Sequence, residues 1–159
     1  MDSAVMFSRK TDEWETPQAL FDELNAEFRF QWDAAATRDT GKCGPFTYFG
    51  PDHVIGEWRD ALAGSWVCLP DSDTRRFWLN PPYSQCRAFI AKAAEEAQKG
   101  ATVVCLVPSR TDTRWWHDHV WDRDRHQPRP GVEVRFLKGR LKFSGASCGD
   151  YLQVPNEQV

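Results

Sequence analysis

The sequence of 159 residues lacks any apolar run of the roughly 18 residues that a membrane-spanning helix requires. Its start has neither a basic segment nor an apolar one after it, so we expect no secretion signal. Neither charge sign is in large excess, because 20 Lys and Arg side chains stand against 23 Asp and Glu side chains. We therefore expect residues 1–159 to form a single domain that does not contact a membrane.

The chain also lacks closely spaced pairs of cysteines. It has five cysteines, an odd number, and no C-x-x-C motif. Cys68 and Cys105 lie in apolar runs, where cysteine serves as a small core residue. We therefore expect the protein to reside in a reducing cytoplasm and to contain no disulfide bonds.

His117 and His119 flank Asp118, but positions i and i+2 of a helix face different directions, so we expect no metal site.

Segments with the apolar spacing of a strand alternate along the chain with segments that have the spacing of a helix, and the sequence contains no internal repeat. Helices are expected over residues 17–28, 85–99 and 112–121, with Gly100 ending the second one. Strands are expected near residues 30–33, 47–49, 66–69, 77–79, 102–107, 132–137 and 151–154. The alternation predicts an α/β fold with a mostly parallel, doubly wound sheet and helices on both faces.

Three polar or turn residues follow predicted strands. Asp33, Asn80 and Pro108 each stand at the carboxyl end of a strand, and ligands bind at that edge in open α/β sheets. We therefore expect these residues to line one site. For Asp33 the alternative is a capping residue for the segment that follows.

The tetrapeptide Asn80-Pro81-Pro82-Tyr83 carries the most specific chemical signal. Its prolines hold the turn extended and lack N–H groups, so carbonyl groups there can accept from a ligand. A carboxamide oxygen and a prolyl carbonyl can accept both hydrogens of a planar amine, and Tyr83 can stack on the ring that carries it. This arrangement suits methyl transfer to an exocyclic amine. The alternative is a rigid turn with the tyrosine covering a small core.

Basic residues concentrate late in the chain. Between Arg129 and Lys142 five basic side chains stand against the single acidic side chain of Glu133. Such a patch can follow a phosphate backbone. The alternative is a solvated strand face.

Six motifs occur in a specific order: Trp14-Glu15-Thr16-Pro17, Trp32-Asp33-Ala34-Ala35-Ala36, Asp60-Ala61-Leu62, Trp78-Leu79-Asn80-Pro81-Pro82-Tyr83-Ser84, Thr111-Asp112-Thr113 and Gly139-Arg140-Leu141-Lys142-Phe143. Over residues 13–143 this order resembles the phage-type DNA N-6-adenine methyltransferases (the phage Dam family). The resemblance implies a Rossmann-like fold, S-adenosylmethionine as cofactor, double-stranded DNA as partner and no metal. It also implies that the protein is located in the cytoplasm of a bacterial host cell. The biological role stays open, and protection of DNA from restriction is one possibility.

Matching positions then imply roles for particular residues. Asn80, Pro81, Pro82 and Tyr83 would be catalytic. Cofactor-binding residues would be Thr16, Pro17, Asp33, Ala34, Asp60 and Asn80. Contacts to DNA would come from Arg110, Arg135, Lys138, Arg140 and Lys142. The recognition sequence and the oligomeric state, monomer or homodimer, stay open.

The C-terminal segment, residues 144–159, departs from the family pattern because it is polar where an apolar closing strand is expected. We therefore expect the sheet to be incomplete at its last strand pair. Residues 71–76 look like a surface insertion. Two alternatives to DNA adenine methylation remain: methylation of an amine in RNA or of a protein glutamine, and a non-catalytic remnant that binds DNA or cofactor.

Overall fold

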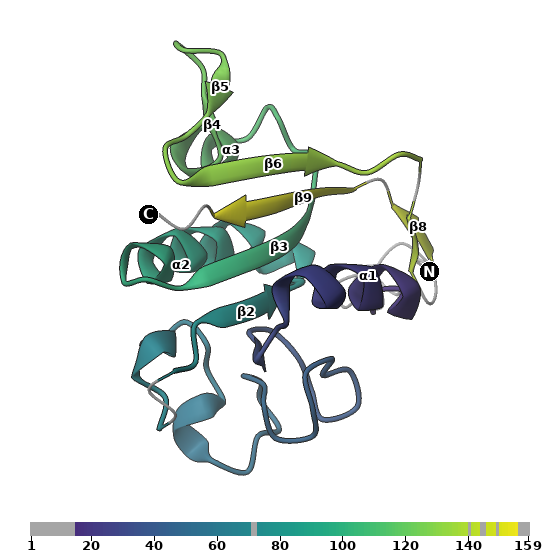
Figure 1. The fold of residues 1–159 in the computed structure, drawn as a ribbon, viewed down its shortest axis with the longest axis vertical. Helices are drawn as coiled ribbons and strands as arrows, with labels where there is room; N and C mark the ends of the chain where they lie inside the picture. The colour runs from purple at the N-terminus through teal and green to yellow at the C-terminus, as the bar shows by residue number, and fades with distance from the viewer. Residues whose placement is uncertain (1–14, 71–72, 140, 144–145, 149, 156–159) are drawn as a thin grey trace, which may run out of the picture.

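A five-stranded sheet with strand order β1-β2-β3-β9-β6 forms the centre of the molecule (Figure 1). The computed structural model describes residues 15–70, 73–139, 141–143, 146–148 and 150–155. The strands are β1 (Trp32–Asp33), β2 (Arg76–Leu79), β3 (Thr102–Pro108), β6 (Val132–Phe136) and β9 (Asp150–Pro155). β1, β2 and β3 run parallel, and β9 is antiparallel to both β3 and β6. The predicted α/β class is confirmed, and the fold is consistent with that of a methyltransferase.

Helices pack on both faces of the sheet. Successive residues of β2 and β3 point to opposite sides, so each strand contributes side chains to both layers of the core. Trp78, Val104 and Leu106 pack with buried residues of α1 (Gln18–Phe28). Phe77 and Leu79 face the other way and share a core with α2 (Cys86–Gln98) and α3 (Arg114–His119). Every residue of β3 is buried, as its continuous apolar run predicted. Gly100 follows α2 with a φ of +100°, which agrees with its predicted role as a helix stop.

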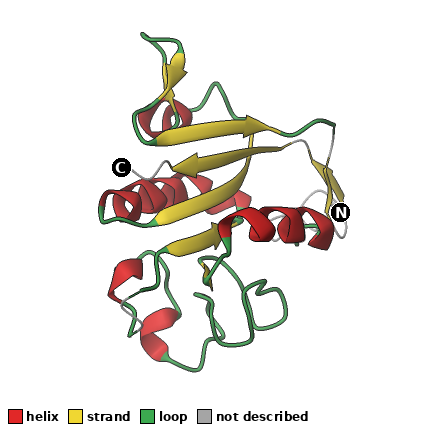
Figure 2. Ribbon diagram, in the orientation of Figure 1, coloured by secondary structure: helices red, strands yellow, loops and turns green. Residues whose placement is uncertain are grey.

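The chain between β1 and β2 is mostly loop (Figure 2). It contains the 3₁₀ helices Gly56–Trp58 and Trp66–Cys68. The strand expected at residues 66–69 was therefore wrong: Trp66 donates its backbone N–H to Glu96 instead of to a neighbouring strand. Near residues 47–49 only an isolated bridge forms, between Asp33 and Tyr48.

The helix expected over residues 112–121 ends early. Trp121 belongs to β4 (Trp121–Asp122), which pairs with β5 (Gln127–Pro128) in a hairpin that projects beyond β6 (Figure 1). The loop expected over residues 122–131 thus contains this small ladder.

The C-terminal segment completes the sheet, so the expected incomplete strand pair was wrong. β9 lies between β3 and β6, with Leu106 opposite Leu152 and Val134 opposite Gln153. Ladder hydrogen bonds join backbone groups, and a polar sequence can therefore supply a closing strand. A further pair, β7 (Leu141–Phe143) and β8 (Ala146–Cys148), precedes β9. Within the expected surface insertion, residues 71–72 lie outside the described residues. Among the described helices, none is both long and apolar enough to span a membrane.

Candidate active site

A cavity of about 650 Å³ opens at the carboxyl ends of β1 and β2. Asp33 ends β1 and Asn80 directly follows β2, so the sheet brings these two residues, far apart in sequence, to one site. Its walls also contain Thr16, Ala35, Lys42, Gly50, Asp60, Leu62, Pro81, Pro82 and Phe89. The volume lies within the range of ligand sites in proteins. Of the sequence-predicted cofactor residues, Pro17 and Ala34 are not among the lining residues.

Asp33 is a buried carboxylate in the wall of this cavity. Its Oδ1 accepts a hydrogen bond from the backbone N–H of Ala35 (3.2 Å), and its Oδ2 accepts one from the backbone N–H of Lys42 (3.1 Å). Burial raises the pKa of Asp33 from its ordinary value of 3.8 to about 7, although these two hydrogen bonds and the Lys42 charge oppose the rise. The loop between β1 and β2 thus folds around one carboxyl group.

Asn80 is oriented by a residue that stands 64 positions earlier in the chain. Its Nδ2 donates a hydrogen bond to Oγ1 of Thr16 (3.1 Å), and the Thr16 side chain is buried. The next two residues, Pro81 and Pro82, also line the cavity. The turn ends in a 3₁₀ helix, Tyr83–Gln85, whose last residue donates its N–H to the carbonyl of Pro82 (3.0 Å).

A second cavity, of about 200 Å³, is bordered by the last residue of the tetrapeptide. Tyr83 lines it together with Pro108, Arg110, Thr113 and Trp115. Asn80, Pro81 and Pro82 therefore border the large cavity, and Tyr83 borders the small one. Pro108 at the end of β3, which the sequence placed at the same edge, belongs to the small cavity.

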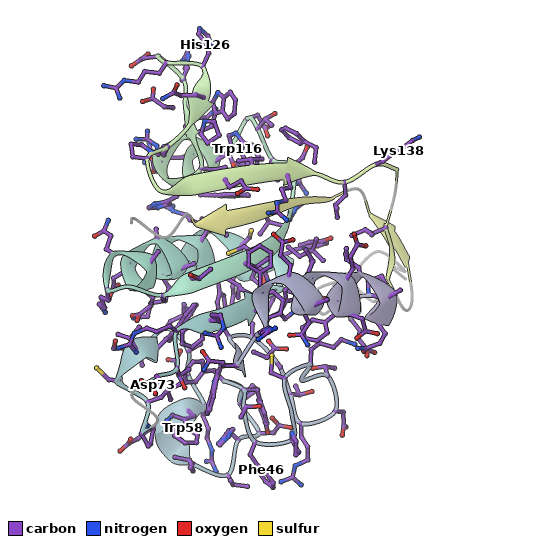
Figure 3. The ribbon with its side chains drawn as sticks, viewed as in Figure 1. Phe46, Trp58, Asp73, Trp116, His126 and Lys138 are labelled. Atoms are coloured by element: carbon purple, nitrogen blue, oxygen red, sulfur yellow. The ribbon has the colours of Figure 1, made fainter. Side chains whose placement is uncertain are left out.

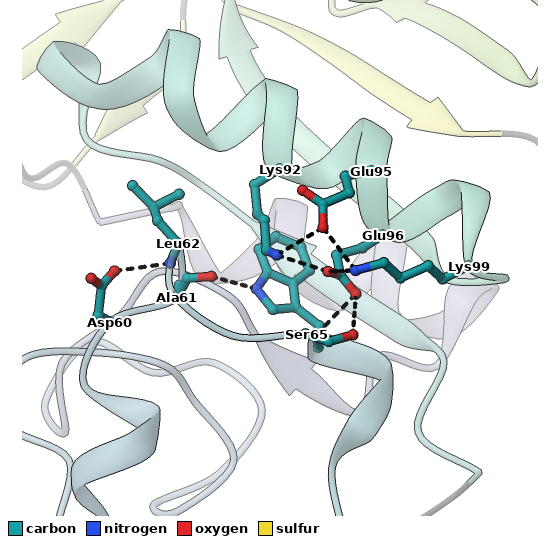
Figure 4. Close-up of polar contacts among 9 residues, drawn as sticks. Asp60, Ala61, Leu62, Ser65, Lys92, Glu95, Glu96 and Lys99 are labelled. Carbon is teal, nitrogen blue, oxygen red and sulfur yellow. Dashed lines mark hydrogen bonds and ion pairs between the residues drawn. The ribbon is translucent and has the colours of Figure 1, made fainter.

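The wall that carries Asp60 is anchored to α2 by a network centred on the buried side chain of Glu96 (Figure 4). Glu96 accepts hydrogen bonds from the Ser65 hydroxyl (3.1 Å) and the Trp66 backbone N–H (2.9 Å). Its other oxygen lies 2.9 Å from the ammonium groups of both Lys92 and Lys99.

The network continues from Trp66 into the cavity wall. The indole N–H of Trp66 donates to the carbonyl of Ala61 (2.8 Å), and Asp60 Oδ1 accepts from the Leu62 N–H (2.9 Å). Burial would raise the pKa of Glu96, but hydrogen bonds from Lys99, Lys92 and Trp66 hold it below its ordinary value. Glu96 therefore remains an anion that fixes residues 60–66.

Gly50 lets two loop segments approach closely. A Cβ atom at this position would lie 1.7 Å from the carbonyl oxygen of Ala36. Both residues line the large cavity, so the glycine shapes its wall directly.

The predicted DNA contacts lie in different settings. Arg110 is exposed beside the small cavity, and Lys138 projects away from the protein beyond the end of β6 (Figure 3). Arg135 forms two 2.7 Å bonds with Glu27 on α1, pairs with Glu133 and lies over the Phe28 ring. Arg140 and the side chain of Lys142 lie outside the described residues.

Sequence reasoning missed Lys42, Gly50 and Glu96. Lys42 and Gly50 lie in a loop without periodicity, and Glu96 carries a signal only in the i, i+4 spacing of Lys92 and Glu96. Among the described residues there is no group of three or more His, Cys, Asp or Glu side chains that could hold a metal ion. His117 instead has its Nε2 2.8 Å from the Thr111 carbonyl oxygen.

An open α/β sheet with a ligand-sized cavity at its carboxyl edge, bordered by a carboxamide and a buried carboxyl group, is the arrangement of a candidate ligand site in an α/β enzyme. The sequence model of the DNA N-6-adenine-methyltransferase (Dam) family matches residues 4–158, and the chain belongs to this family. A DNA N-6-adenine-methyltransferase of Escherichia phage T1 is 27% identical over 147 residues. The match covers 87% of this chain and 56% of the phage protein, so the chain spans about half the length of that curated relative.

Proposed function

We propose that this protein transfers a methyl group from S-adenosylmethionine to the N6 amine of adenine in double-stranded DNA. One observation carries the proposal: Asn80-Pro81-Pro82-Tyr83 borders both a large cavity and a smaller one. A transferase needs such an arrangement, because its catalytic groups must contact cofactor and acceptor together. Membership in the Dam family supports the same reaction.

The large cavity fits the cofactor. Its volume of about 650 Å³ suits a nucleoside with an amino-acid extension, and its walls offer carboxylates, hydroxyls and apolar surface. Thr16, Asp33, Asp60 and Asn80 would hold the cofactor, while Pro17 and Ala34 would support the wall from behind. When bound, S-adenosylmethionine supplies an already activated methyl group, so the protein's task is mainly to position the reactants.

The chain's own groups would hold and polarise the adenine amine. The carboxamide oxygen of Asn80 and the carbonyl oxygen of Pro81 would each accept one N–H of the amine. These bonds favour a pyramidal nitrogen and stabilise the positive charge that develops on it. The bond between Thr16 and Asn80 supports this role, because the Asn80 nitrogen donates to Thr16 and the carboxamide is thereby oriented. The amine finally loses one proton to water.

The small cavity suits the target base. An adenine stacked within a duplex cannot reach this depth, so it must rotate out of the helix. Tyr83 would stack on it and recover part of the unstacking cost, about 1–3 kcal/mol for an aromatic contact. Arg110, exposed beside this cavity, would contact a phosphate. Lys138, Arg140 and Lys142 would extend the contact, whereas Arg135 is held by two carboxylates and is a weaker candidate.

Labelled methyl transfer tests the proposal. The protein is incubated with S-adenosylmethionine and unmethylated duplex DNA, and the product nucleosides are separated. We expect N6-methyladenine with the wild type and none with Asn80→Ala, which should still bind S-adenosylhomocysteine. Methyl transfer only to RNA or only to a protein amide would show that the acceptor is not adenine in DNA. Cofactor binding without any transfer would favour the non-catalytic alternative.

A further inference from the structure

A hairpin with a charged tip, formed by β4 and β5, projects from the molecule next to α3 (Figure 1). Trp121 pairs with Pro128 where the hairpin joins the body of the protein. The tip consists of four exposed residues: Arg123, Asp124, Arg125 and His126. Figure 3 shows His126 at the outer end of the hairpin, beyond Trp116 of α3. The proposed reaction uses none of these residues.

The hairpin is held firmly where it joins the protein. Trp121 packs against the main core, and Val120 before it is fully buried. Nε of Arg129 donates a hydrogen bond to the carbonyl of His117 in α3 (2.7 Å). The backbone N–H of Arg129 donates another to the carbonyl of Val120 (2.9 Å). These contacts fix the direction in which the tip points.

The turn at the tip is held by a single side chain. Oδ1 of Asp122 accepts hydrogen bonds from the backbone N–H groups of Asp124 (3.0 Å) and Arg125 (3.1 Å). Nε of Arg125 lies 3.9 Å from Oδ2 of Asp122, and the Arg125 side chain is 69% exposed, so this ion pair is weak. Among the residues that the structure describes, the side chains of Arg123 and Asp124 have no hydrogen bond or ion pair. The tip therefore presents charged donors and an acceptor to a partner.

The mixture of charges at the tip indicates what kind of partner it suits. A loop that only followed phosphates would gain from each arginine and lose from Asp124, because a carboxylate is repelled by the DNA backbone. In the major groove both kinds of group have partners. An arginine can donate two hydrogen bonds to O6 and N7 of guanine, and a carboxylate can accept one from the N4 amine of cytosine. The major groove is also wide enough for a two-stranded β-ribbon.

The hairpin lies at a suitable distance from the small cavity. Thr113 and Trp115 line this cavity, and the six residues of α3 span about 9 Å. Successive base pairs of DNA are about 3.4 Å apart. The start of the hairpin is therefore about three base pairs from an adenine held in the small cavity. From there the tip can contact base pairs that flank this adenine.

We propose that the β4–β5 hairpin enters the major groove beside the target adenine and that Arg123, Asp124 and Arg125 read the flanking base pairs. This proposal rests on the proposed function and assigns the sequence preference of the reaction to an element outside both cavities. Two explanations compete with it. A solvated turn would predict no effect of these side chains, and a phosphate contact would predict equal weakening at every sequence.

Mapping of N6-methyladenine separates these explanations. The wild type and each variant methylate unmethylated genomic DNA, and sequencing that detects N6-methyladenine gives the relative rate at each sequence context. We expect the wild type to prefer a small set of contexts. Arg123→Ala should reduce about tenfold the ratio of rates between a preferred context and one that differs at a flanking base pair, because a bidentate contact is lost. Arg123→Lys keeps the charge but not the fork, so it should retain affinity for duplex DNA without restoring the ratio.

Asp124→Ala distinguishes base contacts from charge effects. Removing this negative charge should leave the affinity for duplex DNA unchanged or increase it, as measured by fluorescence anisotropy. The same variant should nevertheless reduce the ratio of rates about fivefold or more, because the acceptor for a base amine is lost.

Arg29→Ala is the matched control. Arg29 is exposed after α1, and its carbonyl accepts from Arg76 at the start of β2, so it lies at the edge of the sheet opposite the cavities. Its loss should change neither the affinity nor the ratio of rates. Thermal unfolding of each variant shows whether it is folded.

An unchanged ratio of rates in Arg123→Ala and Asp124→Ala, with or without a change in affinity, would overturn the proposal and leave the proposed function intact. A wild type that methylates adenine equally in every context would do the same. A wild type that binds duplex DNA but forms no N6-methyladenine would overturn the proposed function together with this inference.

Discussion

The hydroxyl of Thr16 accepts a hydrogen bond from the Asn80 carboxamide across 64 residues of sequence (3.1 Å). Thr16 is buried in the segment before α1, whereas Asn80 follows β2, between β1 and β3 in the sheet. The bond leaves the carboxamide in one orientation, which suits an acceptor for an amine. Thr16 is therefore a positioning residue in the proposed reaction.

Thr16→Val, which removes the hydroxyl at nearly constant volume, should lower the rate of methyl transfer about five- to tenfold, because one hydrogen bond contributes about 1 kcal/mol. Single-turnover kinetics measure this rate, and calorimetry with S-adenosylhomocysteine should show a smaller change in affinity. Thr16→Ser keeps the hydroxyl and should retain most of the rate. If Ser and Val were equally impaired, the hydroxyl would not orient Asn80.

Glu96 and Glu95 offer a matched pair on α2. Both contact Lys92 and Lys99, but Glu96 is 0% exposed and Glu95 is 54% exposed. Glu96→Ala should lower the free energy of unfolding by about 3 kcal/mol, since it leaves buried Lys92 without its main partner. Glu95→Ala should have little effect, because exposed ion pairs contribute little. Urea unfolding measures both variants, and similar losses would contradict the role of burial.

Gly50→Ala should destabilise the protein strongly, because its Cβ would overlap the Ala36 carbonyl oxygen. Gly64→Ala is the control, since a Cβ at Gly64 meets no atom within 4 Å. Differential scanning calorimetry should show a large fall in Tm for the first and little change for the second. A Gly50→Ala variant with the wild-type Tm would mean that the two loop segments can separate freely.

Asp33 predicts an unusual pH dependence of stability. Its pKa in the folded chain is about 7, against an ordinary value of 3.8. Between these values the folded state binds more protons than the unfolded state, so the contribution of Asp33 to stability is greatest below about pH 4. This contribution falls as the pH rises from about 4 to about 7, and it levels off above that pH because Asp33 is then ionised in both states.

Urea unfolding of the wild type and of Asp33→Asn between pH 4.5 and 8 checks this sign. The free energy of unfolding of the wild type relative to Asp33→Asn should decrease as the pH rises. A difference that increased with pH would indicate a carboxylate with a lowered pKa instead.

Arg110 and Arg135 should differ in DNA binding. Arg110→Ala should weaken binding and reduce the slope of log K against log salt by about one, as expected for a lost phosphate contact. Arg135→Ala should leave the slope unchanged, because its guanidinium is paired with Glu27 and Glu133. Fluorescence anisotropy at several salt concentrations measures the DNA affinity of both variants and its salt dependence. A reduced slope for Arg135→Ala would mean that Arg135 does contact a phosphate.

Several parts of the fold could be predicted because their signals are local. β3 is a continuous apolar run, and α1 and α2 have apolar residues at helical spacing. Asp33 and Asn80 share an edge because parallel strands bring their carboxyl ends together. The 3₁₀ helix at Trp66–Cys68 was missed, because its apolar sequence is equally compatible with a strand. The hydrogen bond from the Trp66 N–H to Glu96, a residue distant in sequence, favours the helical turn.

The sequence by itself determined the alternation of elements, the buried strands and the chemistry of the Asn80–Tyr83 turn. These properties depend on side-chain periodicity and on the fixed geometry of proline. Only the tertiary structure decided that β9 enters the sheet between β3 and β6, that Thr16 orients Asn80 and that Lys42 lies beside Asp33 in the cavity wall. Strand pairing, burial and hydrogen bonds between distant residues arise when the chain closes on itself, and no local pattern encodes them.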